Sequence, residues 1–163
     1  MNIKHSITTA ALLPLALLTA GNANAFFGDF SQETDGISIT SSNFNNATLL
    51  NEVKVVCPNS GWLLAQADAT FQLEATAVGS TVWIRYSITN DGDNGIDSSH
   101  DRNLQAYVLE SAHAVPGSIM RMDRCAAGEE ISYRFVAQRV SNAESTTAAF
   151  GARMHVQFFR REI

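Results

Sequence analysis

Apolar and polar residues alternate over most of the chain, and the clearest stretch begins at Leu63. The apolar positions there are Leu63, Ala65, Ala67, Ala69, Phe71 and Leu73. The polar positions between them are Gln66, Asp68, Thr70, Gln72 and Glu74. Successive side chains of a strand point to opposite faces, whereas a helix would spread these residues around its cylinder. The pattern therefore predicts a β-strand with one buried face and one solvated face.

The same alternation predicts further strands along the chain. They span residues 48–57, 81–89, 104–110, 118–125, 131–140 and 150–159. In the last of them we expect the inward side chains to be Phe150, Ala152, Met154, Val156 and Phe158. Turn-forming residues separate the predicted strands, at 58–61, 91–101, 116–117, 126–128 and 141–147. No segment has the signature of a capped helix.

Roughly seven or eight short strands with frequent turns predict an all-β fold, a β-sandwich of two antiparallel sheets. An immunoglobulin-like domain would have a buried Trp about a dozen residues after its first cysteine. Here Trp62 follows Cys57 too closely for that pattern, and Trp83 is out of phase with the apolar face of its strand. We therefore prefer a jelly roll to an immunoglobulin-like sandwich.

Three segments carry a resemblance to a known family. Residues 57–64, Cys-Pro-Asn-Ser-Gly-Trp-Leu-Leu, followed by small residues and Phe71, resemble the opening of a long alanine-containing strand. Residues 124–133 and 151–160 resemble the turn before the penultimate strand and the terminal strand. The family is the jelly-roll group of tumour necrosis factor and the complement globular heads, and the chain resembles a bacterial-type secreted member of it. The resemblance runs from Val55 to the end. It implies a homotrimer that packs aromatic residues of its outer sheet around a threefold axis and presents loops to ligands.

The beginning of the chain has the composition of a removable export signal, which we assign to residues 1–25. Lys4 precedes an apolar run over residues 7–18, and Ala-Asn-Ala at 23–25 is typical of a cleavage site. We expect cleavage after Ala25. The protein would then be secreted or periplasmic.

Downstream of the signal, residues 26–47 form a polar segment that we set apart as an N-terminal arm. Its aromatic residues are Phe26, Phe27, Phe30 and Phe44. Such a segment is either disordered at a new terminus or laid over a neighbouring subunit. The β-sandwich domain is then expected over residues 48–163.

The two cysteines, Cys57 and Cys125, are expected to form one disulfide, because thiols oxidise outside the cytoplasm. Closing a loop of this length constrains the unfolded chain by roughly 4 kcal/mol in the loop-entropy treatment. The C-x-x-C spacing of redox-active thiols is missing, so we interpret the bond as structural.

The charge balance excludes some partners. The chain has 11 Lys and Arg against 16 Asp and Glu, a formal net charge of −5. Binding to nucleic acid needs clustered cations, and the only dense cationic spot is Arg160-Arg161. Nucleic acid is therefore not an expected partner. No apolar stretch reaches the roughly 18 residues of a membrane helix, so we expect no direct membrane insertion.

One loop has the composition of a calcium site. Its carboxylates are Asp91, Asp93, Asp97 and Asp101. Oxygen-rich loops with glycine bends suit Ca²⁺, but neither possible register here matches an EF-hand. The alternative is a connecting loop in which Asn94-Gly95 forms the turn and the acids serve solubility. Calcium is the only cofactor that we consider.

No catalytic motif is apparent, and we predict that the protein is not an enzyme. Ser98 or Ser99, His100 and Asp101 are too close in sequence to converge as a triad, and no G-x-S-x-G elbow is present.

Trp83, Tyr107 and Phe159 are our candidates for a binding or oligomer surface, because each is out of phase with the apolar face of its strand. The alternative is that these strands are buried on both faces. The leading hypothesis is a secreted, non-catalytic binding or assembly domain that associates with itself, with a glycan or surface protein as a possible partner. A second hypothesis is a carbohydrate-binding module with an acidic calcium loop. A third is a surface-fibre subunit whose N-terminal extension completes a neighbour's sheet.

Overall fold

The computed structural model describes residues 25–32, 35–75, 80–90, 92–108, 113–140 and 145–160. The strands are β1 (Ala25–Gln32), β2 (Ile37–Ser38), β3 (Thr48–Val56), β4 (Gly61–Ala75), β5 (Ser80–Thr89), β6 (Asp101–Val108), β7 (His113–Cys125), β8 (Glu130–Arg139) and β9 (Ser145–Arg160). These ranges contain no helix, which confirms the all-β prediction. In particular, none of the described residues forms a helix long and apolar enough to cross a membrane.

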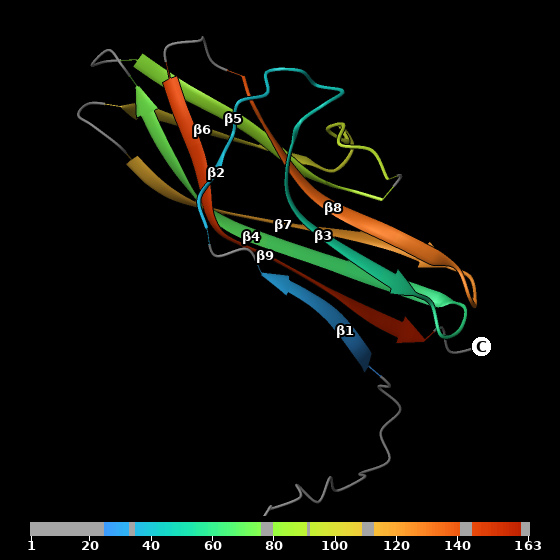
Figure 1. Ribbon diagram of the computed structural model, residues 1–163. Coiled ribbons are helices and arrows are strands. Elements are labelled where there is room, and N and C mark those ends of the chain that lie inside the picture. The colour runs from blue at the N-terminus through green and yellow to red at the C-terminus, as the bar shows by residue number, and fades with distance from the viewer. Residues whose placement is uncertain are drawn as a thin grey trace, which may run out of the picture.

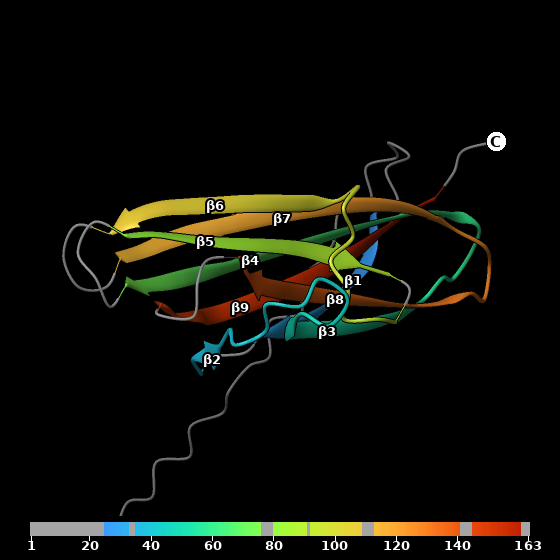
Figure 2. The ribbon, with the colours of Figure 1, turned by 90° about the horizontal axis from the view of Figure 1, so that it is seen from above.

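The strands form two antiparallel sheets that pack face to face (Figure 1, Figure 2). Sheet A has the order β1-β9-β4-β7, with the short β2 also paired to β9, and sheet B has the order β3-β8-β5-β6. Apart from β2, the pairing is nested: β5 pairs with β6, β4 with β7, β3 with β8 and β1 with β9. Such a rolled-up ribbon of paired strands defines a jelly roll, so the predicted architecture is confirmed.

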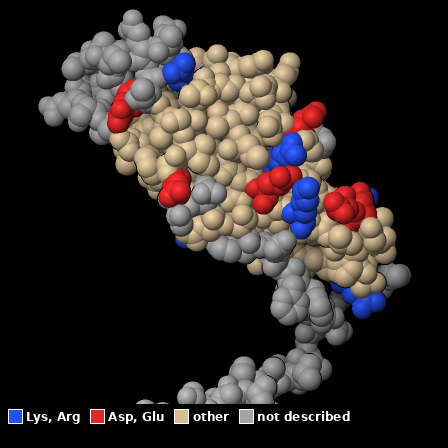
Figure 3. Space-filling view, viewed as in Figure 1, with Lys and Arg blue, Asp and Glu red and all other residues tan. Residues whose placement is uncertain are grey.

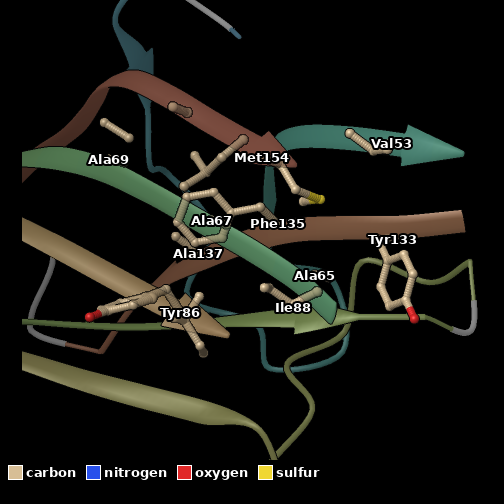
Figure 4. Packing of buried hydrophobic residues seen from close by; sticks show 14 of the residues in the cluster. Val53, Ala65, Ala67, Ala69, Tyr86, Ile88, Tyr133, Phe135, Ala137 and Met154 are labelled. Atoms are coloured by element: carbon tan, nitrogen blue, oxygen red, sulfur yellow. The ribbon is translucent and has the colours of Figure 1, made fainter. Parts of the chain in front are cut away.

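The core lies between the sheets and follows the predicted alternation. Phe71 of β4 lies with its ring centroid 5.1 Å from that of Tyr86 in β5 and 6.5 Å from that of Phe135 in β8. Figure 4 shows Phe135, Ala67 and Met154 gathered in this layer. The small alanines of β4 leave room for the large rings and for Met154 from the neighbouring strands.

The predicted disulfide between Cys57 and Cys125 is present, with a distance of 6.3 Å between the Cα atoms. Cys57 follows β3 of sheet B, and Cys125 ends β7 of sheet A. The bond therefore ties the two sheets together at one end of the sandwich. A disulfide suits an extracellular or periplasmic location.

The segment that the sequence sets apart as an arm contributes to the sandwich. β1 pairs with β9 from Ala25 to Gln32, and β2 pairs with β9 through Ile37 and Ser38. Ile39 is 1% exposed, and its N–H donates to the carbonyl of Thr147 over 2.7 Å. Backbone pairing with β9 thus adds this polar segment to sheet A, and the sandwich begins before residue 48.

Pro116 and Gly117 lie inside β7, so the turn predicted at residues 116–117 is wrong. Pro116 pairs with Thr70 of β4. β7 is the last strand in the order of sheet A, and a proline is tolerated on such an edge because one side of its backbone has no ladder to interrupt.

Phe150 points outward, although alternation predicts it inward. Asp68 pairs with Arg153, but Thr70 pairs with Phe150, so the register shifts between these pairs. The extra residue is a β-bulge, and Gly151 there has a φ of +59°, which favours glycine. The bulge reverses the alternation in β9 and leaves the Phe150 side chain 39% exposed.

Charged residues do not segregate by sign on the side of the molecule seen in Figure 3. Acidic and basic side chains lie next to each other there and leave a broad uncharged area. This side therefore presents no field of a single sign to a charged polymer.

Candidate functional site

Part of the outer face of sheet B is covered by two loops of the same chain. We call residues 39–47 and 92–100 together the loop cover (Figure 1). Val136 points outward from β8 and is nevertheless fully buried, because Ala47 and Ile96 pack on it. A second, small apolar cluster thus lies outside the main core.

Hydrogen bonds join the two loops of the cover. The N–H of Ala47 donates to the carbonyl of Asn94 over 2.7 Å, and the N–H of Ile96 donates to the carbonyl of Phe44 over 2.9 Å. The Phe44 ring also faces the guanidinium of Arg85 in β5, with 5.7 Å from Cζ to the ring centroid. The cover is therefore bound both to itself and to the sheet below.

A buried arginine connects the loop cover to the other sheet. Arg121 points inward from β7, and its side chain is 8% exposed. Its guanidinium donates to Asp97 of the cover over 2.5 Å, to Asp123 over 2.8 Å and to the carbonyl of Ile88 in β5 over 2.9 Å. Asp123 also accepts a hydrogen bond from the Tyr133 hydroxyl over 3.1 Å. This cluster, the Arg121 clamp, closes the side of the sandwich between β7 and β5.

The clamp shifts the ionisation of its members. Burial opposes the charge on Asp97, but hydrogen bonds from Ser99, Arg121 and His100 outweigh it and hold the pKa of Asp97 well below its usual value. Burial, followed by the nearby Asp123 carboxylate, raises the pKa of the Tyr133 hydroxyl. Asp97 is therefore held as a carboxylate against the guanidinium.

The candidate calcium ligands are divided among different partners. Asp97 binds Arg121, Asp101 forms an ion pair with Arg85 at 3.1 Å, and Asp93 is exposed. Asp91 lies outside the described residues. Among the residues that are described, no three or more His, Cys, Asp and Glu side chains are arranged to hold a metal ion. The calcium site stays a prediction.

Ser99 and His100 lie close to Asp97, whereas Asp101, the acid that the sequence analysis considered with them, pairs with Arg85. The Ser99 hydroxyl lies 3.0 Å from His100 Nδ1 and donates to Asp97 Oδ1 over 2.5 Å, while Asp97 Oδ2 lies 3.2 Å from the same Nδ1. A catalytic triad needs the serine at one ring nitrogen and the carboxylate at the other. Here both share Nδ1, so the arrangement fixes the loop and does not activate the serine.

The three candidate aromatic residues do not form one patch. Trp83 points outward from β5 in sheet B and is half-buried. Phe159 points outward from β9 in sheet A and is also half-buried. Tyr107 of β6 pairs with Thr81 of β5, and the side chain of Tyr107 is outside the described part of the structure.

Phe159 belongs to an apolar patch on the outer face of sheet A. Neighbouring strands bring together Trp62, Leu64, Met120, Met122 and Phe159, which we call the apolar patch. Met120 is 63% exposed and Met122 is 55% exposed. At one end, the guanidinium of Arg124 stacks on the Trp62 ring, with Cζ 4.8 Å from the ring centroid.

A groove lies further along the same face. Its lining includes Gln32, Asp68, Thr70, Phe150 and Arg153, and its volume is about 510 Å³. A smaller hollow of about 190 Å³ lies on the other side of the Phe150 ring. We call the two hollows together the Phe150 groove.

The sequence contained signals for several of these residues. Arg121 and Asp123 stand in phase with Ile119 and Cys125, and opposite charges on a buried face indicate an internal ion pair. Gly151 inside a strand is a sign of a bulge. The apolar patch gave a weaker signal, because its members come from three strands that only the fold brings together.

No protein-family model matches the chain, and no curated protein matches it significantly. Several solved structures are similar to it. The EclA C-terminal domain, a sugar-binding protein, is 14% identical, with 75% of this chain and 78% of that domain covered and a TM-score of 0.37. Eiger TNF from S. frugiperda is 10% identical, with 78% and 94% covered and a TM-score of 0.34. The infectious bursal disease virus Gx strain structure is 11% identical, with 94% and 44% covered and a TM-score of 0.23.

A tumour necrosis factor structure is thus among the similar structures, at low identity and a low TM-score. The jelly-roll assignment itself rests on the nested strand pairing.

Proposed function

We propose that the protein is an exported, non-catalytic assembly domain that associates with further copies of itself through the apolar patch. The observation that carries this proposal is the pair Met120 and Met122, both more than half exposed on β7. Met122 lies opposite Leu64 of β4, and Met120 lies opposite Gln66. Covering such exposed methionine side chains with a partner removes apolar surface from water, which lowers the free energy of the complex.

The composition of the patch matches that of protein interfaces. Aromatic residues, methionine and arginine are enriched at interfaces relative to the rest of the surface. The patch contains Trp62, Phe159 and two methionines, with Arg124 beside them. Of the three aromatic candidates from the sequence, Phe159 is the one placed in this patch.

Further copies of the chain are the partners that we favour. Flexible methionine side chains adapt to one another, so the patches of three copies can pack together around a threefold axis. The group that the sequence resembles implies a homotrimer, and we expect three copies. Export would depend on the signal at residues 1–25, with cleavage after Ala25.

Light scattering of the purified secreted protein tests the proposal. The wild-type protein should have the mass of an oligomer, and Met120→Lys combined with Met122→Lys should reduce it to the mass of one chain. The added charges would have to be buried without partners in the contact, which costs several kcal/mol.

Val56→Lys is the matched control, because Val56 is 62% exposed but lies in β3 of sheet B. The control should keep the wild-type mass. A wild-type protein with the mass of a single chain, or a double variant with an unchanged mass, contradicts the proposal. Trp83→Glu tests the candidate on the opposite sheet, and we expect no change of mass from it.

The carbohydrate-binding module with a calcium loop is the second candidate. It requires Asp97 and Asp101 to exchange their arginine partners for a metal ion, so calcium should raise the melting temperature if it is correct. The surface-fibre hypothesis has less support, because it requires the N-terminal extension to complete a neighbour's sheet, whereas β1 pairs with β9 of its own chain.

A further inference from the structure

The bulge in β9 displays an aromatic ring on a sheet face that is otherwise mainly polar in this region. The cross-strand neighbour of Phe150 is Thr70, and the next pair along the strands is Arg153 and Asp68. The ring lies against the backbone of Gly36, where an added Cβ would come within 2.9 Å of the Phe150 Cζ atom. One side of the ring is thus supported, and the side chain remains 39% exposed.

Polar groups surround the ring in both hollows of the Phe150 groove. On one side the lining contains Gln32, Asp68, Thr70, Ser118 and Arg153. On the other side it contains Ser38, Gln72 and Glu74. Donors and acceptors therefore lie on both sides of a single apolar platform.

The charges at the centre of the groove neutralise each other. Arg153 donates to Asp68 Oδ1 from Nε over 3.0 Å and from Nη2 over 2.7 Å. Both bonds end on the same oxygen, which leaves Asp68 Oδ2 and Arg153 Nη1 to bind a polar ligand group. The side chains are 53% and 46% exposed for Arg153 and Asp68, so a ligand can reach them.

These features specify the chemistry of a ligand. An ion gains little from a neutral pair, and a wholly apolar ligand would strip water from Asp68 and Arg153 without replacing its hydrogen bonds. A ring with an apolar C–H face and hydroxyl groups around its rim satisfies the platform and the polar groups together. We propose that the Phe150 groove binds a pyranose ring of a neutral saccharide, stacked on Phe150 and hydrogen-bonded to Asp68 and Arg153.

This site is separate from the apolar patch and from the loop with the candidate calcium ligands. It lies on sheet A and needs no metal ion. Its binding should therefore persist in the presence of a chelator and in a protein that no longer self-associates.

Amide NMR titrations of the secreted protein test the proposal. The probes are the methyl glycosides of mannose, galactose, glucose and fucose, with chelator present and with glycerol as the control polyol. At least one glycoside should produce saturable shifts at Phe150, Gly151 and Gly36, whereas glycerol should produce none. Loss of the stacking platform in Phe150→Ala should weaken that binding about tenfold.

Phe44→Ala is the matched control, because Phe44 is 37% exposed and lies in the loop cover. It should leave the affinity unchanged. Asp68→Asn keeps the shape of the side chain and should weaken binding while the spectrum of the free protein stays dispersed. A soluble mannan or dextran, titrated in parallel, distinguishes a polymer ligand from a free sugar by its higher affinity per ring.

The absence of saturable shifts with every glycoside and both polymers overturns the proposal, as does binding that survives Phe150→Ala unchanged. Repeating the titration on the Met120→Lys, Met122→Lys variant separates the two proposals. The mass from light scattering then reports whether the protein self-associates, and the amide NMR shifts report independently whether it binds a saccharide.

Discussion

The outer faces of the two sheets differ in how far their outward apolar side chains are buried. On sheet B, Val136 points outward and is fully buried, because the loop cover packs on it. On sheet A, Met120 and Met122 point outward and are more than half exposed. Among the described residues that point outward from β4 and β7, none is buried. The same alternating pattern thus produces a region around Val136 that the chain itself covers and a face of sheet A that the described chain leaves open.

The difference shows what an outward apolar residue means in a sandwich. An outward valine can be a core residue of a second cluster when a loop returns over it. An outward methionine on an uncovered strand has no such role within the described chain, and its exposure is better explained by binding. The loop cover itself depends on polar contacts, above all on the Arg121 clamp, which crosses from sheet A to the loop above sheet B.

The largest expected effect comes from breaking the clamp. Arg121→Met removes the cation that Asp97 and Asp123 share and leaves two partly buried carboxylates without it. Removing one partner of a buried ion pair costs about 3–5 kcal/mol of unfolding free energy. Urea denaturation measures the loss, and hydrogen exchange at the Ile96 amide should show that the loop cover opens first.

Arg153→Met is the control for this variant. The Arg153–Asp68 pair has similar contact distances but lies on the open face, with both side chains about half exposed. Exposed pairs are worth about 0–1 kcal/mol. Equal losses in the two variants would mean that the clamp has no special role in holding the cover.

The next largest effect is a loss of stability from the same substitution, Val to Thr, made at a covered site and at an exposed site. Val136→Thr places a hydroxyl beneath the loop cover, where a polar group without a partner costs about 1–3 kcal/mol. Val56→Thr makes the same change at a position that is 62% exposed, and surface changes of this kind stay within about 0.5 kcal/mol. Thermal unfolding of both variants measures the difference. If the two losses are alike, Val136 is not covered in solution.

Much of the fold could be predicted from alternation, since burial of one face per strand is a local property of the sequence. The apolar side chains at alternate positions from Leu63 to Leu73 are buried as expected, and the disulfide joins the two sheets. The errors share a cause. Pro116 and Phe150 are read correctly only when their neighbours in the sheet are known: the first needs an edge strand, and the second needs a bulge opposite Ala69.

The candidate site was less predictable, because cross-strand neighbours are distant in sequence. Met122 and Leu64 form one row only after β7 pairs with β4. The acidic loop suggested calcium because its composition is local, whereas Arg121 and Arg85, which bind its carboxylates, come from other strands. The acidic residues of the loop could thus be recognised from the sequence, whereas their arginine partners could be recognised only from the fold.

The smallest expected effect is a pH dependence confined to the covered face. The hydrogen bonds of Asp97 lower its pKa in the folded protein, so the unfolded chain takes up a proton at a higher pH than the folded one. The stability that this carboxylate contributes is therefore complete above an unfolded pKa of about 3.9 and is lost as the pH falls below it. Urea unfolding at a series of acidic pH values should show this loss.

Asp97→Asn should flatten that part of the profile, because the amide does not titrate. Glu52, whose pKa is also lowered, first by the hydrogen bond from Ser132, contributes a loss of the same sign that this variant retains. A profile equally steep in Asp97→Asn and in the wild type would place the acid sensitivity outside the clamp and contradict this prediction.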